Sequence, residues 1–376
     1  MSGERTFDYE KAFNHGPLGC GGGSCRSCRT CDYDCKGNRT GLGDEEGVDE
    51  EIFYLQWHLT ALCTNRCAHC YHEDYGTGGL AEDQLFAIAD HFDEALDAWG
   101  RTGKVALTGG EPLIIKETTL AVSERLLAGH TDRIDILTNG TLVTHEVLDQ
   151  LGALGPGARH IQLSIDGTQQ THDAIRGEGD FARVMRAAEL VKLAGFSLSF
   201  MFTLSDHNAA DLIAVHKIVE SFGATIGIDR YAPLGQATNR DISTVSSEVV
   251  RTAVQQVVEW RKERGDGLRG TYRPLFGMFT EDLGAMCGIG LGSLCVMHDG
   301  AVLPCRRLPV PLWNALDGFL DQWEANEFLS RMRDPSAVPA CAECDKLRQC
   351  RGCRAQAWVT TGDAFGPDPD CQYPAA

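Results

Sequence analysis

The 376-residue sequence has no apolar run that approaches the roughly 20 residues of a membrane-spanning helix. Its first residues, MSGERTFDYEKAF, lack the apolar core and the cleavage site of a signal peptide. Basic side chains are scarce as well, because 34 Lys and Arg stand against 53 Asp and Glu, a formal net charge of −19. Phosphate binding needs clustered Lys and Arg, so we expect a cytoplasmic protein that binds neither nucleic acid nor a membrane.

Cysteine, by contrast, is abundant. Sixteen cysteines in a chain without a secretion signal indicate metal binding rather than disulfides. Cys63, Cys67 and Cys70 form the pattern C-x3-C-x2-C directly after an apolar run. Three thiolates can hold three irons of a cubane cluster and leave the fourth iron without a protein ligand. A zinc site is the alternative, since the three thiolates with His69 or His72 would also suit zinc.

From residue 53 onward, strand-like and helix-like patterns alternate. The expected strands cover residues 53–59, 104–108, 133–138, 160–166, 197–203 and 225–231. Six βα units predict an α/β fold in which helices pack outside a parallel sheet. Active residues on such sheets gather at the carboxyl ends of strands, and Cys63, Gly109, Asn139 and Asp166 lie at or just past such ends.

The segments around this pattern differ from it in composition. Residues 1–50 are rich in Gly and Cys and have too few apolar residues for a core, so a metal or a partner must order them. We expect a core barrel over residues 51–235 and a helical bridge over 236–285, with its helix at 246–264. Cysteine, Gly and Pro become frequent over residues 286–376, which indicates a second domain organised by metal.

The expected second strand is followed by Gly109, Gly110, Glu111 and Pro112. The two glycines let the backbone come close to a ligand, and Glu111 offers a carboxylate. An ordinary βα turn is the alternative. Asn139 follows the third strand in an Asn-Gly pair, which either faces the same site or forms a common turn.

The segment Ser-Ile-Asp-Gly, which begins at Ser164, ends the expected fourth strand, and Arg176 lies twelve positions after Ser164. A guanidinium group binds a carboxylate well through its two-pronged geometry. The alternative for Arg176 is that it only pairs with a nearby carboxylate such as Asp173.

The cysteine triad and the Gly-Gly-Glu-Pro segment together resemble the signature of the radical SAM enzymes. This resemblance implies an enzyme with a partial (β/α)6 barrel, whose open iron chelates S-adenosylmethionine (SAM). Reductive cleavage of SAM then yields a 5′-deoxyadenosyl radical that abstracts hydrogen. The resemblance also implies that Glu111 bonds the SAM amino group. In the peptide- and protein-modifying branch, which the sequence resembles further, Ser164 and Arg176 would hold SAM.

Eight cysteines in the C-terminal segment are as many as two fully ligated cubanes require. Their spacing resembles the SPASM domain, which holds two auxiliary 4Fe-4S clusters. The resemblance implies two ligand sets: Cys287, Cys295, Cys305 and Cys353, and Cys341, Cys344, Cys350 and Cys371. A zinc ribbon would account only for the cysteines from 341 to 353.

The C-terminal segment departs from the family pattern at two places. Sulfatase-maturing relatives have an aspartate base where Arg306 follows Cys305, so oxidation of Ser or Cys to formylglycine is disfavoured. Cys350 and Cys353 are separated by two residues instead of the usual three, as in a subset close to haem and cofactor maturases.

Five more cysteines lie near the N-terminus, at Cys20, Cys25, Cys28, Cys31 and Cys35. The last four follow the bacterial ferredoxin spacing, and the first three equally fit the start of the plant-type spacing. A further iron–sulfur cluster and a zinc site are both open readings. A third is a built-in peptide that resembles a substrate.

These observations predict a radical SAM oxidoreductase from an anaerobic setting, reduced by a flavodoxin- or ferredoxin-type protein. The first hypothesis for its reaction is maturation of a peptide or protein substrate. The second is side-chain decarboxylation or deacetylation of a haem-type tetrapyrrole. The hypothesis from another class is a non-catalytic electron-transfer protein, which would not need Gly109, Ser164 or Arg176 beside a three-cysteine cluster.

Overall fold

The structure is a computed structural model that describes residues 51–72, 75–76, 78–235, 246–264, 287–344, 347 and 350–371. The five N-terminal cysteines and most of the predicted bridge lie outside the described residues. Among the helices of the described part, none is both long and apolar enough to cross a membrane.

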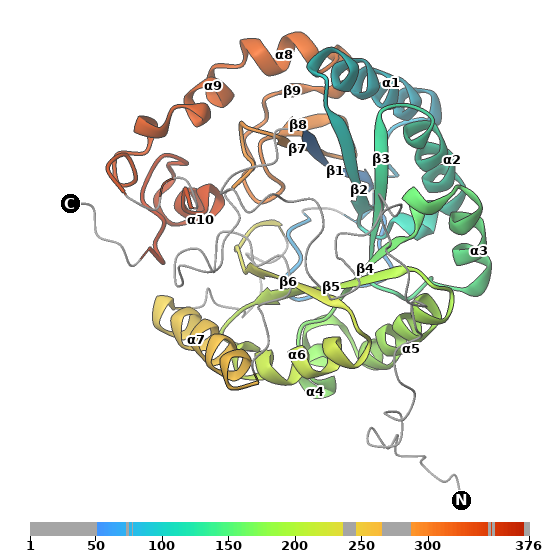
Figure 1. The fold of residues 1–376 in the computed structure, drawn as a ribbon, viewed down its shortest axis with the longest axis vertical. Coiled ribbons are helices and arrows are strands. Elements are labelled where there is room, and N and C mark those ends of the chain that lie inside the picture. Colours follow the sequence, from blue (N-terminus) through green and yellow to red (C-terminus); the bar gives the residue numbers. More distant parts are fainter. Residues whose placement is uncertain are drawn as a thin grey trace, which may run out of the picture. The chain divides into compact units, whose positions relative to one another are not determined.

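All six predicted strands are present, and each is parallel to its neighbour. They curve into an open barrel, which confirms the predicted partial (β/α)6 architecture (Figure 1). Their buried side chains are largely branched and aromatic, as both-face burial in a parallel sheet requires. The strands are β1 Ile52–Thr60, β2 Thr102–Gly109, β3 Thr131–Thr138, β4 His160–Ser164, β5 Ser197–Leu204 and β6 Thr225–Arg230.

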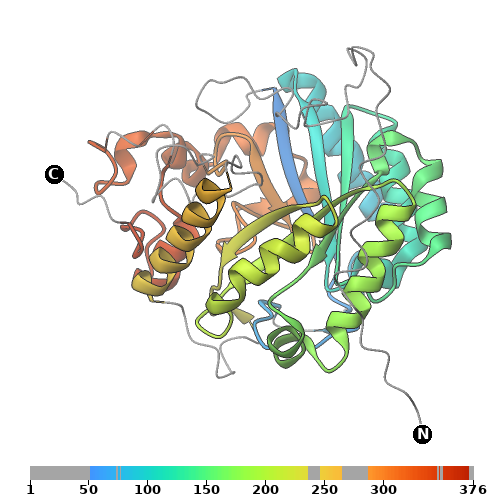
Figure 2. The ribbon, with the colours of Figure 1, turned by 60° about the horizontal axis from the view of Figure 1, so that its bottom comes forward.

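Helices cover the outer face of this sheet (Figures 1 and 2). Each turns an apolar stripe inward; in α1, for example, Leu85, Ile88 and Phe92 are buried at helical spacing. The helices of the barrel are α1 Glu82–Trp99, α2 Lys116–Leu127, α3 His145–Ala153, α4 Gln169–Arg176, α5 Asp180–Leu193 and α6 Leu212–Ser221. The helix expected at 246–264 is α7, Ser247–Glu263.

The C-terminal segment continues the barrel sheet. β7 (Ser293–Val296) pairs in parallel with the free edge of β1, and β8 (Ala301–Leu303) and β9 (Trp313–Asn314) follow antiparallel. The nine strands therefore form one sheet in the order β6-β5-β4-β3-β2-β1-β7-β8-β9. Beyond it lie α8 (Leu320–Ala325), α9 (Glu327–Arg333) and α10 (Arg354–Thr361).

Two apolar clusters divide the C-terminal segment. Phe53 of β1 packs edge-on against Trp323 of α8, so this part shares the barrel core. A smaller cluster around Leu308, Met332 and Phe365 lies under α10. The small size of this second cluster fits a region that bound metal helps to stabilise.

Candidate active site

The cysteine triad lies on the loop that leaves the carboxyl end of β1. Cys67 is buried, and Cys63 and Cys70 are half-buried. The loop is fastened to α4 by a hydrogen bond from the Ala68 N–H to the carbonyl oxygen of Ile175, 2.8 Å long. Burial raises the pKa of Cys63, and it raises that of Cys67 to about 12. The protein alone therefore keeps these thiols protonated, whereas bound iron would stabilise their thiolates, which fits a cluster site.

Gly109 and Gly110 pack against the backbone that leads into this loop. The Gly110 N–H donates to the Thr60 carbonyl oxygen at 2.7 Å. A Cβ on Gly109 would overlap the Thr60 carbonyl oxygen, and one on Gly110 would overlap that of Leu62. Because Gly109 and Gly110 have no side chains, this segment can pack closely against the backbone of residues 60–62. It fixes the start of the cysteine loop.

Glu111 is completely buried, and both of its carboxylate oxygens accept hydrogen bonds from the protein. One oxygen accepts from the Thr138 hydroxyl at 2.8 Å and from the Leu113 N–H at 3.1 Å, and the other from the Asn139 N–H at 2.8 Å. Burial raises the pKa of Glu111 to about 7. This carboxylate joins the ends of β2 and β3. Pro112, buried beside it, begins a 3₁₀ turn.

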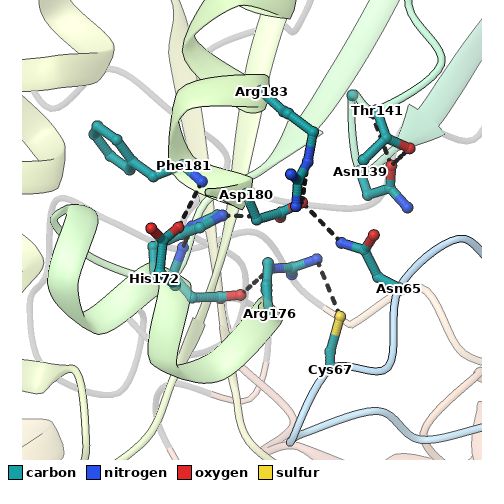
Figure 3. A network of polar contacts seen from close by, with 12 residues as sticks. Asn65, Cys67, Asn139, Thr141, His172, Arg176, Asp180, Phe181 and Arg183 are labelled. Atoms are coloured by element: carbon teal, nitrogen blue, oxygen red, sulfur yellow. Dashed lines mark hydrogen bonds and ion pairs between the residues drawn. The ribbon is translucent and has the colours of Figure 1, made fainter. Parts of the chain in front are cut away.

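Arg176, the last residue of α4, lies between Asp166 and the cysteine loop. Its Nε donates to the Asp166 carboxylate, and its Nη1 lies 3.9 Å from Cys67 Sγ (Figure 3). His69 Nε2 contacts the same Asp166 oxygen at 2.8 Å. Asp166 is buried, yet the Arg176 and His69 charges keep its pKa well below the usual range. The carboxylate therefore stays ionised and fixes the direction of the Arg176 guanidinium.

A second buried carboxylate, Asp180, holds the other side of the loop. It accepts from Asn65 Nδ2 at 3.0 Å, contacts His172 Nε2 at 3.1 Å and pairs with Arg183 (Figure 3). The His172 Nδ1 in turn accepts from the Asp166 N–H at 3.1 Å. The two carboxylates thus form one network under the cysteines. Neither Asp180 nor His172 stands in a motif that predicts a role in the site.

Asn139 and Ser164 occupy the ends of β3 and β4. The Asn139 side chain donates to the Thr64 hydroxyl at 2.9 Å and lies 3.8 Å from Cys63 Sγ. Its carbonyl oxygen accepts from the Thr141 N–H at 2.9 Å, so the Asn-Gly turn and the contact with the cysteine loop coexist. Ser164 is half-buried at the carboxyl end of β4.

The geometry around the cysteine triad suits a zinc ion less well than it suits a cubane cluster. His69 Nε2 is engaged by Asp166, and His72 Nε2 by the Gly109 carbonyl oxygen at 2.8 Å. Within the described ranges, no three Cys, His, Asp or Glu side chains come together closely enough to bind a single metal ion. A cubane needs wider spacing, because each thiolate binds a different iron.

The C-terminal cysteines lie in two groups. In the first, burial, with smaller contributions from nearby Cys287 and Cys353, raises the pKa of Cys305 to about 11. Burial also raises the pKa of Cys295, and nearby Cys305 adds a smaller contribution.

In the second group, burial raises the pKa of Cys350 to about 12, and Cys371 and Cys341 contribute. Burial, Cys371 and Cys344 likewise raise the pKa of Cys341. These groups have the same members as the ligand sets that the resemblance implies. Their assignment to two clusters stays a prediction.

Buried ion pairs attach this segment to the barrel. Arg230, at the end of β6, binds Asp368 through two hydrogen bonds of 2.8 and 2.7 Å and also pairs with Asp370. The Arg306 guanidinium stacks on the Tyr71 ring at 3.5 Å and donates to the Tyr71 carbonyl oxygen at 3.0 Å. Tyr71 directly follows Cys70, so the two cysteine-bearing regions are in contact.

Residues 57–219 match the family described as the Radical SAM superfamily. Among curated proteins, the chain is 29% identical over 349 residues to the AdoMet-dependent heme synthase of Methanosarcina barkeri, covering 85% of this chain and 96% of that protein. It is also 29% identical to the Mycofactocin maturase MftC of Mycobacterium ulcerans, covering 87% of this chain and 89% of that protein.

Solved structures share the fold. The chain superposes on anSMEcpe with bound AdoMet with a TM-score of 0.67 at 18% identity, over 85% of this chain and 94% of that one. The superposition on Streptococcus suis SuiB bound to S-adenosylmethionine has a TM-score of 0.64 at 17% identity, over 86% of this chain and 78% of that one. Both likenesses extend beyond the barrel into the C-terminal segment.

Proposed function

Because this chain is a radical SAM enzyme with a SPASM-type C-terminal domain, we propose that it matures a peptide or protein by abstracting hydrogen from a side chain or α-carbon. The observation that carries this proposal is the convergence of Arg176 and Asn139 on the cysteine loop, at the carboxyl ends of parallel strands. A non-catalytic electron carrier would not need an oriented guanidinium there.

The three thiols of Cys63, Cys67 and Cys70 would hold the cluster that binds SAM. When bound, the cluster and SAM supply a carbon-centred radical that abstracts hydrogen from the substrate. The residues of the chain position these groups. Asp166 orients Arg176, whose remaining N–H groups can bind the SAM carboxylate. Glu111 acts by holding the ends of β2 and β3 together, since its oxygens already accept three hydrogen bonds.

A peptide substrate is supported by the relatives named Mycofactocin maturase MftC, which align over most of this chain. The position after Cys305 argues against formylglycine formation. Arg306 lies there, tied to Tyr71, and a guanidinium cannot serve as the base. The proton acceptor for any peptide oxidation must therefore be another group. Reduction by a flavodoxin- or ferredoxin-type protein belongs to this proposal.

A haem-type tetrapyrrole is the second candidate substrate. The relatives named AdoMet-dependent heme synthase favour it, since one of them aligns over 96% of its own length. The two-residue separation of Cys350 and Cys353 points the same way.

One experiment separates these functions. The enzyme, purified and reconstituted without oxygen, is incubated with SAM, dithionite and either synthetic peptides encoded by neighbouring genes or an iron tetrapyrrole that carries propionate groups. We expect 5′-deoxyadenosine and a mass change in a peptide, and neither with Cys67→Ala. A mass change in the tetrapyrrole alone would favour the second candidate. An intact enzyme that cleaves no SAM at all would leave only electron transfer.

A further inference from the structure

Asp229 is a carboxylate near the carboxyl end of β6, the strand at one edge of the nine-stranded sheet. The side chains of Ile226 and Ile228 on the same strand are buried in the apolar core. Because side chains alternate between the two faces of a strand, Asp229 lies on the opposite face, toward the inside of the barrel. Its side chain is 42% exposed. Ligands of parallel sheets bind at the carboxyl ends of the strands, so an accessible carboxylate here can contact a substrate.

Three other carboxylates at this end of the barrel, Glu111, Asp166 and Asp180, have a different environment. All three are completely buried, and each of their oxygens contacts a protein group. They therefore hold the strand ends and the cysteine loop in place. Asp229 is accessible instead, which fits contact with a bound molecule.

The Asp229 carboxylate is held in position by the C-terminal segment. The Arg307 guanidinium donates through Nη2 to Asp229 Oδ1 at 2.9 Å and through Nη1 to the Arg230 carbonyl oxygen at 2.8 Å. Arg307 lies two residues after Cys305, so this contact joins the first cysteine group to the edge strand. In the described part of the chain, no hydrogen bond reaches the other oxygen, Oδ2. One oxygen is thus fixed, and the other remains as an acceptor.

Asp229 is also close to the residues around the cysteine triad. It pairs with Thr203 of β5, whose N–H donates to Asp166 Oδ1 at 3.0 Å. Asp166 in turn orients Arg176 beside Cys67. Two strand spacings separate Asp229 from Asp166, which is roughly 10 Å. An extended peptide covers this distance with about three residues.

We propose that Asp229 binds a hydrogen-bond donor of the substrate, and that this substrate is a peptide rather than a haem-type tetrapyrrole. A carboxylate accepts hydrogen bonds and donates none. A peptide offers backbone N–H groups and donor side chains. The propionate groups of a tetrapyrrole are carboxylates themselves, and like charges repel. The inference rests on the proposed function and specifies which class of substrate that site takes.

The test is a calorimetric titration of the reconstituted, SAM-loaded enzyme. The probes are the synthetic peptides encoded by neighbouring genes and the iron tetrapyrrole that carries propionate groups. Asp229→Ala should weaken peptide binding about tenfold or more, because it removes a hydrogen bond to a charged group. Asp90→Ala is the matched control, since Asp90 pairs with Arg125 and its side chain is 46% exposed, but it lies on the outer helix α1. Its peptide affinity should equal that of the wild type.

A double-mutant cycle separates direct contact from a structural role. Donors of the peptide are removed one at a time, side chains by substitution and backbone N–H groups by N-methylation. Removal of the donor that contacts Asp229 should cost about tenfold with the wild type and almost nothing with Asp229→Ala. Iron content and SAM affinity show whether the variant folds. If it does not, Asp229→Asn replaces it in the cycle, because the amide keeps the shape of the side chain and removes the charge.

Equal peptide affinities for the folded variant and the wild type would overturn the proposal, and so would a cycle without a coupled position. A wild-type enzyme that binds none of the peptides, with or without affinity for the tetrapyrrole, would overturn it too. Because binding is measured and not turnover, the two proposals can fail separately. A peptide that is bound through Asp229 but never modified would reject the proposed reaction alone.

Discussion

Arg176 offers the sharpest single-residue prediction. Arg176→Ala should weaken SAM binding about tenfold or more, since a hydrogen bond to a charged group contributes roughly 1.5–3 kcal/mol. Calorimetric titration of the reconstituted enzyme measures the affinity. Arg183→Ala is the control, because Arg183 pairs with Asp180 in the same network yet its side chain is 38% exposed. Equal SAM affinities for Arg176→Ala and the wild type, with full iron content, would reject the role.

Glu111 predicts a pH effect. Its carboxyl keeps a proton up to about pH 7 in the folded chain, against an ordinary pKa of 4.5. Between these two pKa values the folded state binds more protons than the unfolded state. The free energy of unfolding therefore falls as the pH rises from about 4.5 through the folded pKa of about 7. Between pH 6 and 8 this group should cost about 1 kcal/mol. Glu111→Gln should remove that part of the profile.

Thermal unfolding of the reconstituted protein at several pH values checks this prediction. The exposed neighbour Glu117 supplies the control variant, Glu117→Gln, whose profile should match the wild type. Parallel profiles for Glu111→Gln and the wild type would show that Glu111 is ionised throughout.

For single residues, the sequence predicts which side chains belong to the site better than it predicts which groups they contact. The cysteine triad, Asn139 and Arg176 stand in local motifs, and the structure brings Asn139 and Arg176 to the triad. The partner of Arg176 was not predictable, because Asp173 is nearer in sequence. Asp173 is instead used by the N–H groups of Gly179 and Phe181, and Asp166 reaches Arg176 only through the folded β4–α4 turn.

At the scale of helices and strands, the contact between the carboxyl end of β2 and the cysteine loop leads to a testable prediction. Gly110→Ala would drive a Cβ into the carbonyl oxygens of Ala61 and Leu62, and such overlap typically costs 1–3 kcal/mol. We expect the displaced loop to lose the irons of the radical cluster, measured as iron per chain and as 5′-deoxyadenosine formed. Gly78→Ala is the matched control, since nothing lies within 4 Å of its Cβ position. Full iron content and activity in Gly110→Ala would contradict this account.

The strands of the barrel could be predicted because each is a run of five to nine residues with a clear apolar pattern. The strands β7, β8 and β9 could not, because they are only four, three and two residues long. Their place in the sheet depends on a pairing with β1 that is far away in sequence. Only the folded chain reveals that Cys295 lies in register with Gln56.

For the whole molecule, the two C-terminal cysteine groups predict separate losses of metal. The double variant Cys287→Ala/Cys353→Ala should lose about four irons per chain, one cubane, and keep the other clusters. The double variant Cys341→Ala/Cys371→Ala should likewise lose about four irons per chain, those of the other cubane. Iron and sulfide analysis after anaerobic reconstitution measures both. Loss of zinc instead of iron, or loss of all auxiliary iron in either variant, would show that the grouping is wrong.

The junction between β1 and β7 has a consequence for synthesis. β1 is made early, and its edge partner leaves the ribosome more than 200 residues later. At translation rates of about 5–20 residues per second, this edge of β1 waits at least about 10 s with its backbone groups unpaired. An open strand edge of this kind is a template for aggregation. This edge of the nascent chain therefore stays open to pairing with other strands until the last quarter of the chain has been made.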